Sequence, residues 1–185
     1  MLKFPSKKTI DEQRPEFALL PQDDYELKII DVLPDQQNQY MAKPDPKTGK
    51  IPQVEVMNFT FEVVAFKDGS QAVDVDGKDA TGRKVFFTGR QNKDGEWTMG
   101  FQNDGTASKL RQLVCYATNQ DIEEEVELEA WEQLLGKTIY AEIVKYTTQK
   151  GDVRNKIGRF LPAKKEREKI KKEEEIDIPI VEDEG

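Results

Sequence analysis

The segment Val54–Val64, VEVMNFTFEVV, decides the fold class, because apolar and polar residues alternate along it. A repeat of two is the period of a β-strand, in which successive side chains point to opposite faces of a sheet. The face expected to cover the core carries Met57, Phe59, Phe61 and Val63. The opposite face carries Val56, Asn58, Thr60 and Glu62. This segment therefore predicts a β protein with a half-buried strand near its centre.

Four more segments have the composition of β-strands and are bounded by turn-forming residues. They are Tyr25–Val32, Lys84–Arg90, Thr138–Tyr146 and Val153–Leu161. Before the central strand, Leu33–Pro52 holds four prolines and predicts a long loop. Asp94-Gly95 predicts a hairpin turn, after which Glu96–Phe101 is expected to return as a strand.

A helix is predicted after this hairpin, with Thr106 or Ser108 as its N-cap. Its apolar residues at positions i, i+3, i+4 and i+7 form one helical face. They are Leu110, Leu113, Val114 and Ala117. A second short helix is expected over Leu128–Leu135, with Gly136 as its C-cap.

The predicted order places a helix between the third and fourth of five strands, which is the pattern of the oligonucleotide-binding (OB) barrel. Closure into a barrel also removes the long open edges through which strands aggregate. The predicted fold class is therefore mainly β: a five-stranded OB-fold barrel with a helix between strands 3 and 4. We expect a lead-in over residues 1–20, the barrel domain over 21–162 and a flexible charged tail over 163–185.

Charge is segregated along the chain, whose formal net charge is −8. Residues 1–162 hold 22 basic and 27 acidic side chains, residues 163–172 hold six and two, and residues 173–185 hold none and seven. Blocks of like charge bury too little apolar surface to fold, so the tail is predicted to be disordered. Within residues 136–162, six basic side chains accompany two acidic ones. Binding depends on such a local field rather than on the total charge.

The residue types exclude several kinds of catalytic site. The chain has one cysteine, Cys115, and no histidine, so it lacks a Cys–His pair, a Ser–His–Asp triad and a His-ligated zinc site. A single cysteine fits a reducing compartment. Met1–Lys8 has no apolar run of signal-peptide length, and no segment approaches the roughly 20 apolar residues of a membrane helix. We expect a cytoplasmic, non-enzymatic protein with no cofactor and no membrane partner.

The first candidate binding residues lie where cations and aromatic rings share a strand face. One face of the strand at 84–90 holds Val85, Phe87 and Gly89, and the other holds Lys84, Phe86, Thr88 and Arg90. Single-stranded nucleic acids are bound by cations that pair with phosphates and by rings that stack on bases. Trp97 follows the hairpin tip, where its ring is expected to reach beyond the barrel. The alternative is that Phe86 and Trp97 only cover the core.

The last two strands carry the densest positive charge. We expect Arg154 and Lys156 on one face of the final strand, and Ile157 and Arg159 on the other. The loop between strands four and five is a contact site in OB folds. The alternative is a solvated surface with ordinary lysines. The candidate nucleic-acid-binding residues are Lys84, Phe86, Arg90, Trp97, Tyr140, Lys145, Tyr146, Lys150, Arg154 and Lys156.

Two acidic clusters do not predict a metal site. Asp74, Asp76 and Asp79, together with Gly77, resemble an acidic calcium loop, but counting Asp74 as position one, the twelfth residue is Val85 instead of glutamate. The glutamates at 123, 124, 125, 127 and 129 are typical of a solvated segment that complements a helix dipole.

Three stretches have a recognisable pattern: Leu20–Val32 (LP…Y-x-L-x-I-x-D-V), Asn58–Val63 (NFTFEV) and Leu135–Pro162 (L-G-K…A-E-I…K-G…N-K-I…F-L-P). Together they resemble the phage-type single-stranded DNA-binding proteins with an OB fold. The resemblance implies sequence-independent binding of single-stranded DNA in the replication, recombination or repair of bacteriophage DNA, in the cytoplasm of the host. It leaves open whether the chain forms a homo-oligomer.

The resemblance also implies that the acidic tail binds replication or recombination proteins. In bacterial relatives such tails end in an acidic run with a terminal Pro-Phe, whereas this chain ends in Glu-Asp-Glu-Gly. The partner-binding residues implied here are Asp177, Ile178, Pro179, Ile180, Glu182, Asp183 and Glu184.

Two other functions stay open. The net negative charge of residues 1–162 favours a protein-interaction module with no nucleic-acid role. A metal-dependent nuclease would need carboxylates at a spacing suited to metal-assisted hydrolysis, with an accompanying lysine, and the sequence shows no such set.

Overall fold

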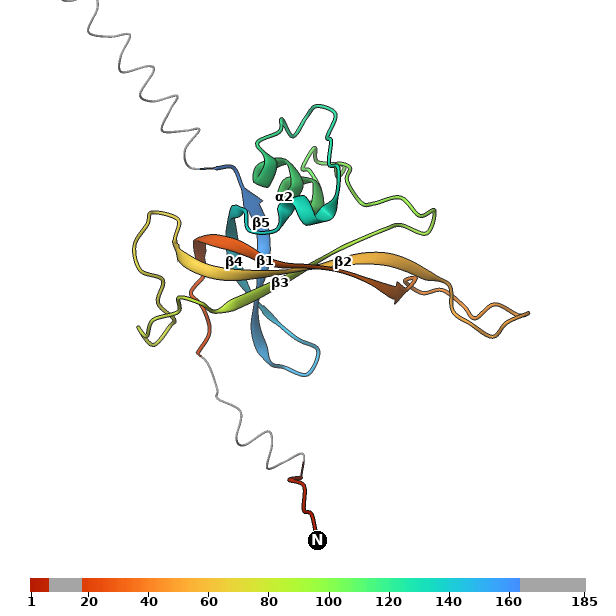
Figure 1. The fold of residues 1–185 in the computed structure, drawn as a ribbon, viewed down its shortest axis with the longest axis horizontal. Helices are drawn as coiled ribbons and strands as arrows, with labels where there is room; N and C mark the ends of the chain where they lie inside the picture. The colour runs from red at the N-terminus through yellow and green to blue at the C-terminus, as the bar shows by residue number, and fades with distance from the viewer. Residues whose placement is uncertain (7–17, 164–185) are drawn as a thin grey trace, which may run out of the picture.

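The computed structural model describes residues 1–6 and 18–163 and contains one antiparallel sheet of five strands (Figure 1). The strand order is β3-β2-β1-β4-β5. The strands are β1 (Asp23–Asn38), β2 (Gln53–Phe66), β3 (Lys84–Arg90), β4 (Thr138–Thr147) and β5 (Val153–Leu161). The prediction of a mainly β protein is therefore confirmed, and all five expected segments form strands.

The expected loop between the first two strands is much shorter than predicted, because β1 and β2 extend into a long two-stranded ribbon (Figure 1). Their pairing continues to Asn38 and Gln53, so only residues 39–52 connect them. Pro34 lies inside β1 and pairs with Met57. Since β1 pairs with β4 only over Asp23–Lys28, Pro34 lies beside an edge without a ladder, where its missing N–H costs no hydrogen bond.

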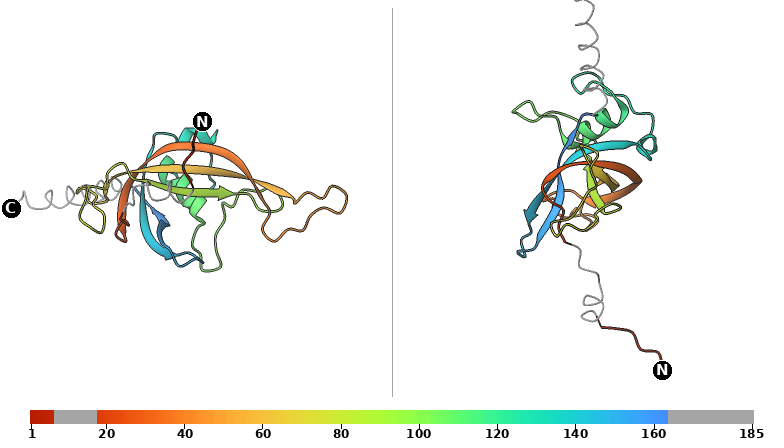
Figure 2. Two further views of the ribbon diagram at one scale, coloured as in Figure 1. Left: turned by 90° about the horizontal axis from the view of Figure 1, so that it is seen from below. Right: turned by 90° about the vertical axis from the view of Figure 1, so that its left-hand side faces the viewer.

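The sheet curls strongly, because β1 pairs with β2 along its whole length and with β4 near its start (Figure 2). Irregular register between Glu26 and Leu27, and between Ile29 and Asp31, accompanies the bend. The ladder does not continue from β3 to β5 among the described strands, so the predicted closed barrel is not formed by hydrogen bonds. We call the gap between these two strands the β3–β5 seam.

Helix α2 (Lys109–Thr118) spans the β3–β5 seam from the sequence between β3 and β4. Its Gln112 Oε1 accepts a hydrogen bond of 2.9 Å from the backbone N–H of Phe160 in β5. Lys109 Nζ donates one of 2.9 Å to the carbonyl of Ile157. The rings of Phe87 and Phe160 meet across the seam with centroids 5.4 Å apart. The seam is therefore closed by side chains instead of a ladder.

The predicted apolar face of α2 is confirmed, since Leu110, Leu113, Val114 and Ala117 are all buried. Ser108 is its N-cap, and the Ser108 hydroxyl accepts a hydrogen bond from the backbone N–H of Arg111. Gly89 of β3 allows this close packing, because a Cβ there would lie 2.7 Å from Leu110 Cδ1 and would force the Leu110 side chain to shift.

The second predicted helix is only one 3₁₀ turn, η1 (Trp131–Leu134). Ala130 before it is extended and supplies no side-chain cap. Leu135 after it is extended again, and Gly136 then has a φ of 81°. Because Ala130 provides no side-chain acceptor for the first backbone N–H groups, a helix longer than this single turn is not stabilised.

The core lies on the predicted face of the central strand. Met57, Phe59, Phe61 and Val63 are buried there, whereas Val56 was expected on the outer face and is also fully buried. The apolar face of α2 and the inner faces of β1, β4 and β5 complete the core. Within the described ranges, no helix has the length and apolar character needed to cross a bilayer.

The hydrogen bond between Gln112 and Phe160 is expected to contribute to the stability of the fold. Gln112→Leu keeps a buried side chain of similar size but removes both the acceptor for the Phe160 N–H and the donor to the Ala107 carbonyl. We expect a loss of about 1–3 kcal/mol in the free energy of unfolding, because a buried donor loses its partner. Denaturant unfolding measures this loss, with Gln149→Leu in the exposed β4–β5 turn as control. Equal stability of the Gln112→Leu protein and the wild type would show that the seam does not depend on this bond.

Candidate nucleic-acid interface

The predicted split of β3 into two faces agrees with the burial of its side chains. Lys84, Phe86, Thr88 and Arg90 are exposed, whereas Val85 and Gly89 are buried and Phe87 packs against the core. The Phe86 side chain is 65% exposed. The alternative that Phe86 covers the core is therefore wrong, and a ring between two cations is displayed to solvent.

Uncharged polar residues of β2 flank this ring. Phe86 pairs with Thr60, and Thr88 pairs with Asn58. The Thr88 hydroxyl donates a hydrogen bond of 2.7 Å to Asn58 Oδ1. In the next pair along the strands, Lys84 lies opposite Glu62. The surface around Phe86 is therefore polar and contains both signs of charge.

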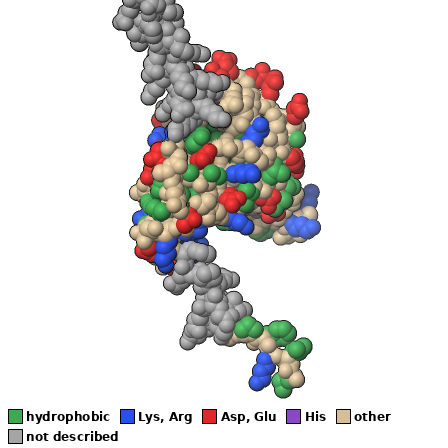
Figure 3. Space-filling model, turned by 60° about the vertical axis from the view of Figure 1, so that its left-hand side comes forward, with side chains coloured by type: hydrophobic (Ala, Val, Ile, Leu, Met, Phe, Trp, Pro, Cys, Tyr) green, Lys and Arg blue, Asp and Glu red, His purple; other side chains and the backbone are tan. Residues whose placement is uncertain are grey.

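Mixed charge is a general property of the surface. On the face drawn in Figure 3, blue Lys and Arg side chains alternate with red Asp and Glu side chains. In β4 and β5, Arg159 lies 3.4 Å from Glu142, and Arg154 lies 3.9 Å from Asp152. Both pairs are largely exposed, so each contributes little to stability. The cations are thus local groups rather than one continuous basic face.

The expectation that Trp97 reaches beyond the barrel is wrong. Its ring is half-buried and packs edge-on against Trp131, with centroids 4.9 Å apart. The expected return strand over 96–101 does not form either. In its place are two isolated bridges, Gln91 with Trp97 and Phe101 with Ala107, joined by tight turns at Gly95 and Gly105. These turns fold the chain back, so Trp97 contacts the core.

The hairpin formed by β4 and β5 carries the remaining predicted residues. Lys145, Lys150, Arg154 and Lys156 are exposed, and Tyr140 and Tyr146 are half-buried. The ammonium of Lys156 lies 5.1 Å from the centre of the Tyr146 ring, within range of a cation–π interaction. Arg154 and Lys156 pair with Tyr146 and Val144 and share their face of the sheet.

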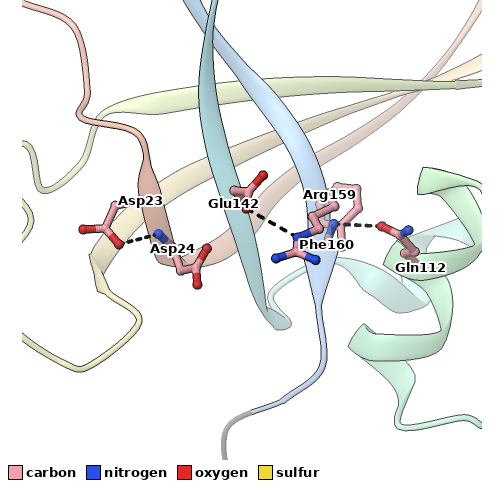
Figure 4. A network of polar contacts seen from close by, with 6 residues as sticks. All are labelled: Asp23, Asp24, Gln112, Glu142, Arg159 and Phe160. Carbon is pink, nitrogen blue, oxygen red and sulfur yellow. Dashed lines mark hydrogen bonds and ion pairs between the residues drawn. The ribbon is translucent and has the colours of Figure 1, made fainter. Parts of the chain in front are cut away.

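The predicted position of Arg159 is wrong. A register shift beside Glu142 pairs Ile143 with Ile157 and Glu142 with Arg159, which leaves Gly158 as an extra residue. Arg159 therefore returns to the exposed face and forms its ion pair with Glu142 (Figure 4). The same view shows Gln112 bonded to Phe160 on the other side of β5.

The Lys145 side chain lies on a different face of the sheet from the other candidate residues of the hairpin. It pairs with Asn155, on the face opposite that of Tyr146. The Asn155 side chain makes two hydrogen bonds to the backbone of Leu20, of 2.8 and 2.9 Å. The Lys145 backbone N–H is bonded to Gln22 Oε1. The segment before β1 therefore contacts the β4–β5 hairpin near its turn, and Tyr146, Arg154 and Lys156 form a compact group on the exposed face of the hairpin.

Sequence reasoning missed two groups of side chains near these strands. Lys109 reaches β5 from the helix, and burial together with the charge of Lys156 lowers the pKa of Lys109. The ribbon loop holds the exposed Tyr40 and Met41, of which Met41 has a φ of 54°. The loop also carries Lys43, Lys47 and Lys50. The three lysines within residues 43–50 could have identified this loop as a candidate binding segment from the sequence. No sequence pattern places Lys109 beside Lys156.

The partner-binding residues Asp177, Ile178, Pro179, Ile180, Glu182, Asp183 and Glu184 lie outside the described residues. Among residues 1–6 and 18–163, His, Cys, Asp and Glu side chains form no group of three or more that could hold a metal ion. The carboxylate of Asp74 instead accepts backbone hydrogen bonds from Asp76 and Lys78 in its own turn.

Comparison of the chain with models of known protein families and with curated proteins gave no match. The ligand of this protein is therefore inferred from the geometry of the exposed strand faces.

Proposed function

We propose that this protein binds single-stranded DNA without a catalytic step, in the replication, recombination or repair of bacteriophage DNA. The observation that carries the proposal is the exposed face of β3. There a ring that is 65% exposed stands between Lys84 and Arg90 on a rigid strand. An exposed ring on a strand is available to stack on a base, and the cations beside it are available to pair with phosphates.

The topology supports an OB fold. β1 pairs with both β2 and β4, and α2 lies between β3 and β4 in the sequence and spans the seam between β3 and β5. The contact of Phe87 with Phe160 brings β3 and β5 together without a ladder. OB folds bind oligonucleotides on the face of strands 2 and 3, flanked by the loops that join strands 1–2 and 4–5. Phe86 lies on that face.

The β4–β5 hairpin provides a second contact for the same strand. Tyr146 with Lys156 over its ring offers stacking and charge together, and Arg154 lies opposite Tyr146. In Val144–Gly151 there are two lysines and no carboxylate. Phosphates respond to this local field, so binding is compatible with the negative charge of the whole chain.

The acidic C-terminal segment has two roles in this proposal. A tethered run of seven carboxylates competes with DNA for the cations, and the same run recruits replication or recombination proteins when DNA displaces it. Both roles use the charge of residues 173–185, and neither needs a fixed structure.

A second candidate function is a protein-interaction module with no nucleic-acid role. The observation that favours it is a run of exposed carboxylates between α2 and η1, namely Asp121, Glu123, Glu124, Glu125, Glu127 and Glu129. Arg111 holds this segment by hydrogen bonds to the carbonyls of Ile122 and Glu124. A gel shift with poly-dT separates the two functions, since only the DNA-binding protein retards it.

Phe86→Ala tests whether the exposed ring of β3 contacts DNA. We expect DNA binding to weaken by about 1–3 kcal/mol, the contribution of one stacked base. The ring is exposed, so the free energy of unfolding changes little. Phe4→Ala, which removes a ring that is exposed outside the sheet, is the control and keeps the affinity of the wild type. Fluorescence anisotropy with labelled oligo-dT measures both, and unchanged binding by Phe86→Ala would overturn the β3 site.

Salt dependence tests the phosphate contacts. With six cations engaged, we expect log affinity to fall with log salt at a slope of about −4, from about 0.7 for each phosphate contact. Lys156→Gln is expected to reduce the slope by about 0.7, and Lys78→Gln in the β2–β3 loop, which is not one of the six cations, leaves it unchanged. An affinity independent of salt would contradict the proposal. The six cations are Lys84, Arg90, Lys145, Lys150, Arg154 and Lys156.

Deletion of residues 173–185 tests the competing role of the acidic segment. We expect the shortened chain to bind oligo-dT more tightly than the full chain at low salt, with a smaller difference at high salt, because salt screens the competing carboxylates. Titrations at two salt concentrations measure this. Equal affinities would refute competition and leave recruitment as the role of the segment.

A further inference from the structure

The β1–β2 ribbon ends in a loop, residues 39–52, that projects from the sheet (Figure 1). We call this loop the ribbon tip. The last contact of the ribbon with β3 is the pairing of Val56 with Arg90. Beyond it the ribbon continues through the pairs 55–36, 54–37 and 53–38, a stem about 10 Å long. The ribbon tip is therefore separated from the exposed face of β3.

Two apolar side chains stand at the corner of a tight turn in the ribbon tip. The N–H of Ala42 donates a hydrogen bond of 3.2 Å to the carbonyl of Gln39, so Tyr40 and Met41 are the two central residues of this turn. Met41 has a φ of 54°, in a left-handed region that side chains other than glycine rarely adopt. Tyr40 is 85% exposed and Met41 83% exposed. The backbone of the turn thus displays a ring and a thioether together.

The rest of the ribbon tip is positively charged. Residues 39–52 hold three lysines, Lys43, Lys47 and Lys50, which are all exposed, and one carboxylate, Asp45. The Asp45 carboxylate accepts the backbone N–H of Lys47 at 2.8 Å, and the N–H of Asp45 donates to the carbonyl of Lys50 at 2.8 Å. The carboxylate is therefore engaged within its own turn, and the tip combines apolar side chains with a net positive charge.

The stem does not carry this positive charge back to β3. Residues 35–38 and 53–55 include two carboxylates and no lysine or arginine. Asp35 pairs with Val56, which pairs with Arg90, so Asp35 lies on the same face as Arg90. Glu55 lies on the opposite face. A single strand that leaves Arg90 along the stem meets carboxylates instead of cations, so the ribbon tip is a contact separate from that of β3.

We propose that the ribbon tip binds the end of a duplex that adjoins the single strand held on β3. The terminal base pair of a duplex presents a flat apolar face, which a ring and a thioether side chain can cover. The two strands of the duplex bring phosphates to either side of that face, where lysines beside the turn can pair with them. A single base offers a smaller face and only one chain of phosphates. The ligand of the tip is therefore a junction between single-stranded and double-stranded DNA.

This inference rests on the proposed function and adds a second DNA contact to it. The test compares a labelled hairpin duplex that carries an oligo-dT tail with a labelled oligo-dT of the same length as the tail. The full wild-type chain is expected to bind the tailed hairpin about tenfold more tightly, the effect of about one stacked base. Tyr40→Ser/Met41→Asn is expected to bring the ratio to within about twofold and to keep the affinity for oligo-dT. Asparagine is used at position 41 because it tolerates a left-handed backbone.

The matched control is Leu2→Ser/Phe4→Ser. It removes one aliphatic and one aromatic side chain outside the ribbon, and these are 85% and 84% exposed, as much as those of the tip. This variant is expected to keep the tenfold ratio, so a general effect of exposed apolar surface is separated from recognition by the tip.

Equal binding of the tailed hairpin and oligo-dT by the wild type would overturn the inference and leave the proposed function intact. If Tyr40→Ser/Met41→Asn weakens the binding of both DNAs to the same extent, the tip contacts only the single strand and the inference is wrong. Binding of neither DNA by the wild type would overturn the inference and the proposed function together.

Salt dependence tests the role of the three lysines. The slope of log affinity against log salt is expected to be steeper for the tailed hairpin than for oligo-dT, by about 0.9 for each duplex phosphate contact. Lys43→Gln/Lys47→Gln/Lys50→Gln is expected to remove this difference and to leave the slope for oligo-dT unchanged. Equal slopes for the two DNAs in the wild type would contradict phosphate contacts at the tip.

An anionic membrane surface is the other partner that a tip with a ring, a thioether and lysines suits. Cosedimentation with vesicles of phosphatidylserine and phosphatidylcholine tests for it. If the wild type cosediments, Tyr40→Ser/Met41→Asn does not, and the ratio of tailed hairpin to oligo-dT is one, the tip is a membrane contact and the duplex-end proposal is wrong.

Discussion

The fold depends on how the β3–β5 seam is closed. Five strands with the order β3-β2-β1-β4-β5 bring two edges together, and the backbone groups of β5 at this edge need partners. Helix α2 supplies them, through Gln112 to the N–H of Phe160 and through Lys109 to the carbonyl of Ile157. The same helix packs Leu110 against a glycine of β3. One short helix thus substitutes for a ladder between β3 and β5.

The curvature determines which side chains face solvent. The helix and the inner strand faces occupy the concave side, so the alternate residues of β3 and of the β4–β5 hairpin are left on the outside. This is where Phe86 and Tyr146 lie with their neighbouring cations. Because these residues project from strands whose other faces are buried, their positions are preorganised, and a ligand pays little conformational entropy to use them.

Positive charge on the surface occurs in small groups, with carboxylates between them. Carboxylates lie beside several of the cations, as in the pairs of Arg159 with Glu142 and Arg154 with Asp152. Such a surface has no continuous basic face, so rings and the phosphate contacts of individual cations must supply most of the affinity that we propose.

The sequence by itself determined the strands, the helix face and the exposed face of β3, because residue alternation and helical spacing are properties of short segments. β3 and β5 begin and end where the pattern predicted. Only the tertiary structure decided the side of Arg159, the packing of Trp97 and the length of the ribbon. These depend on one extra residue at Gly158, on two tight turns and on pairing between distant segments. The seam partners are 48 residues apart in the chain, so no local pattern encodes their contact.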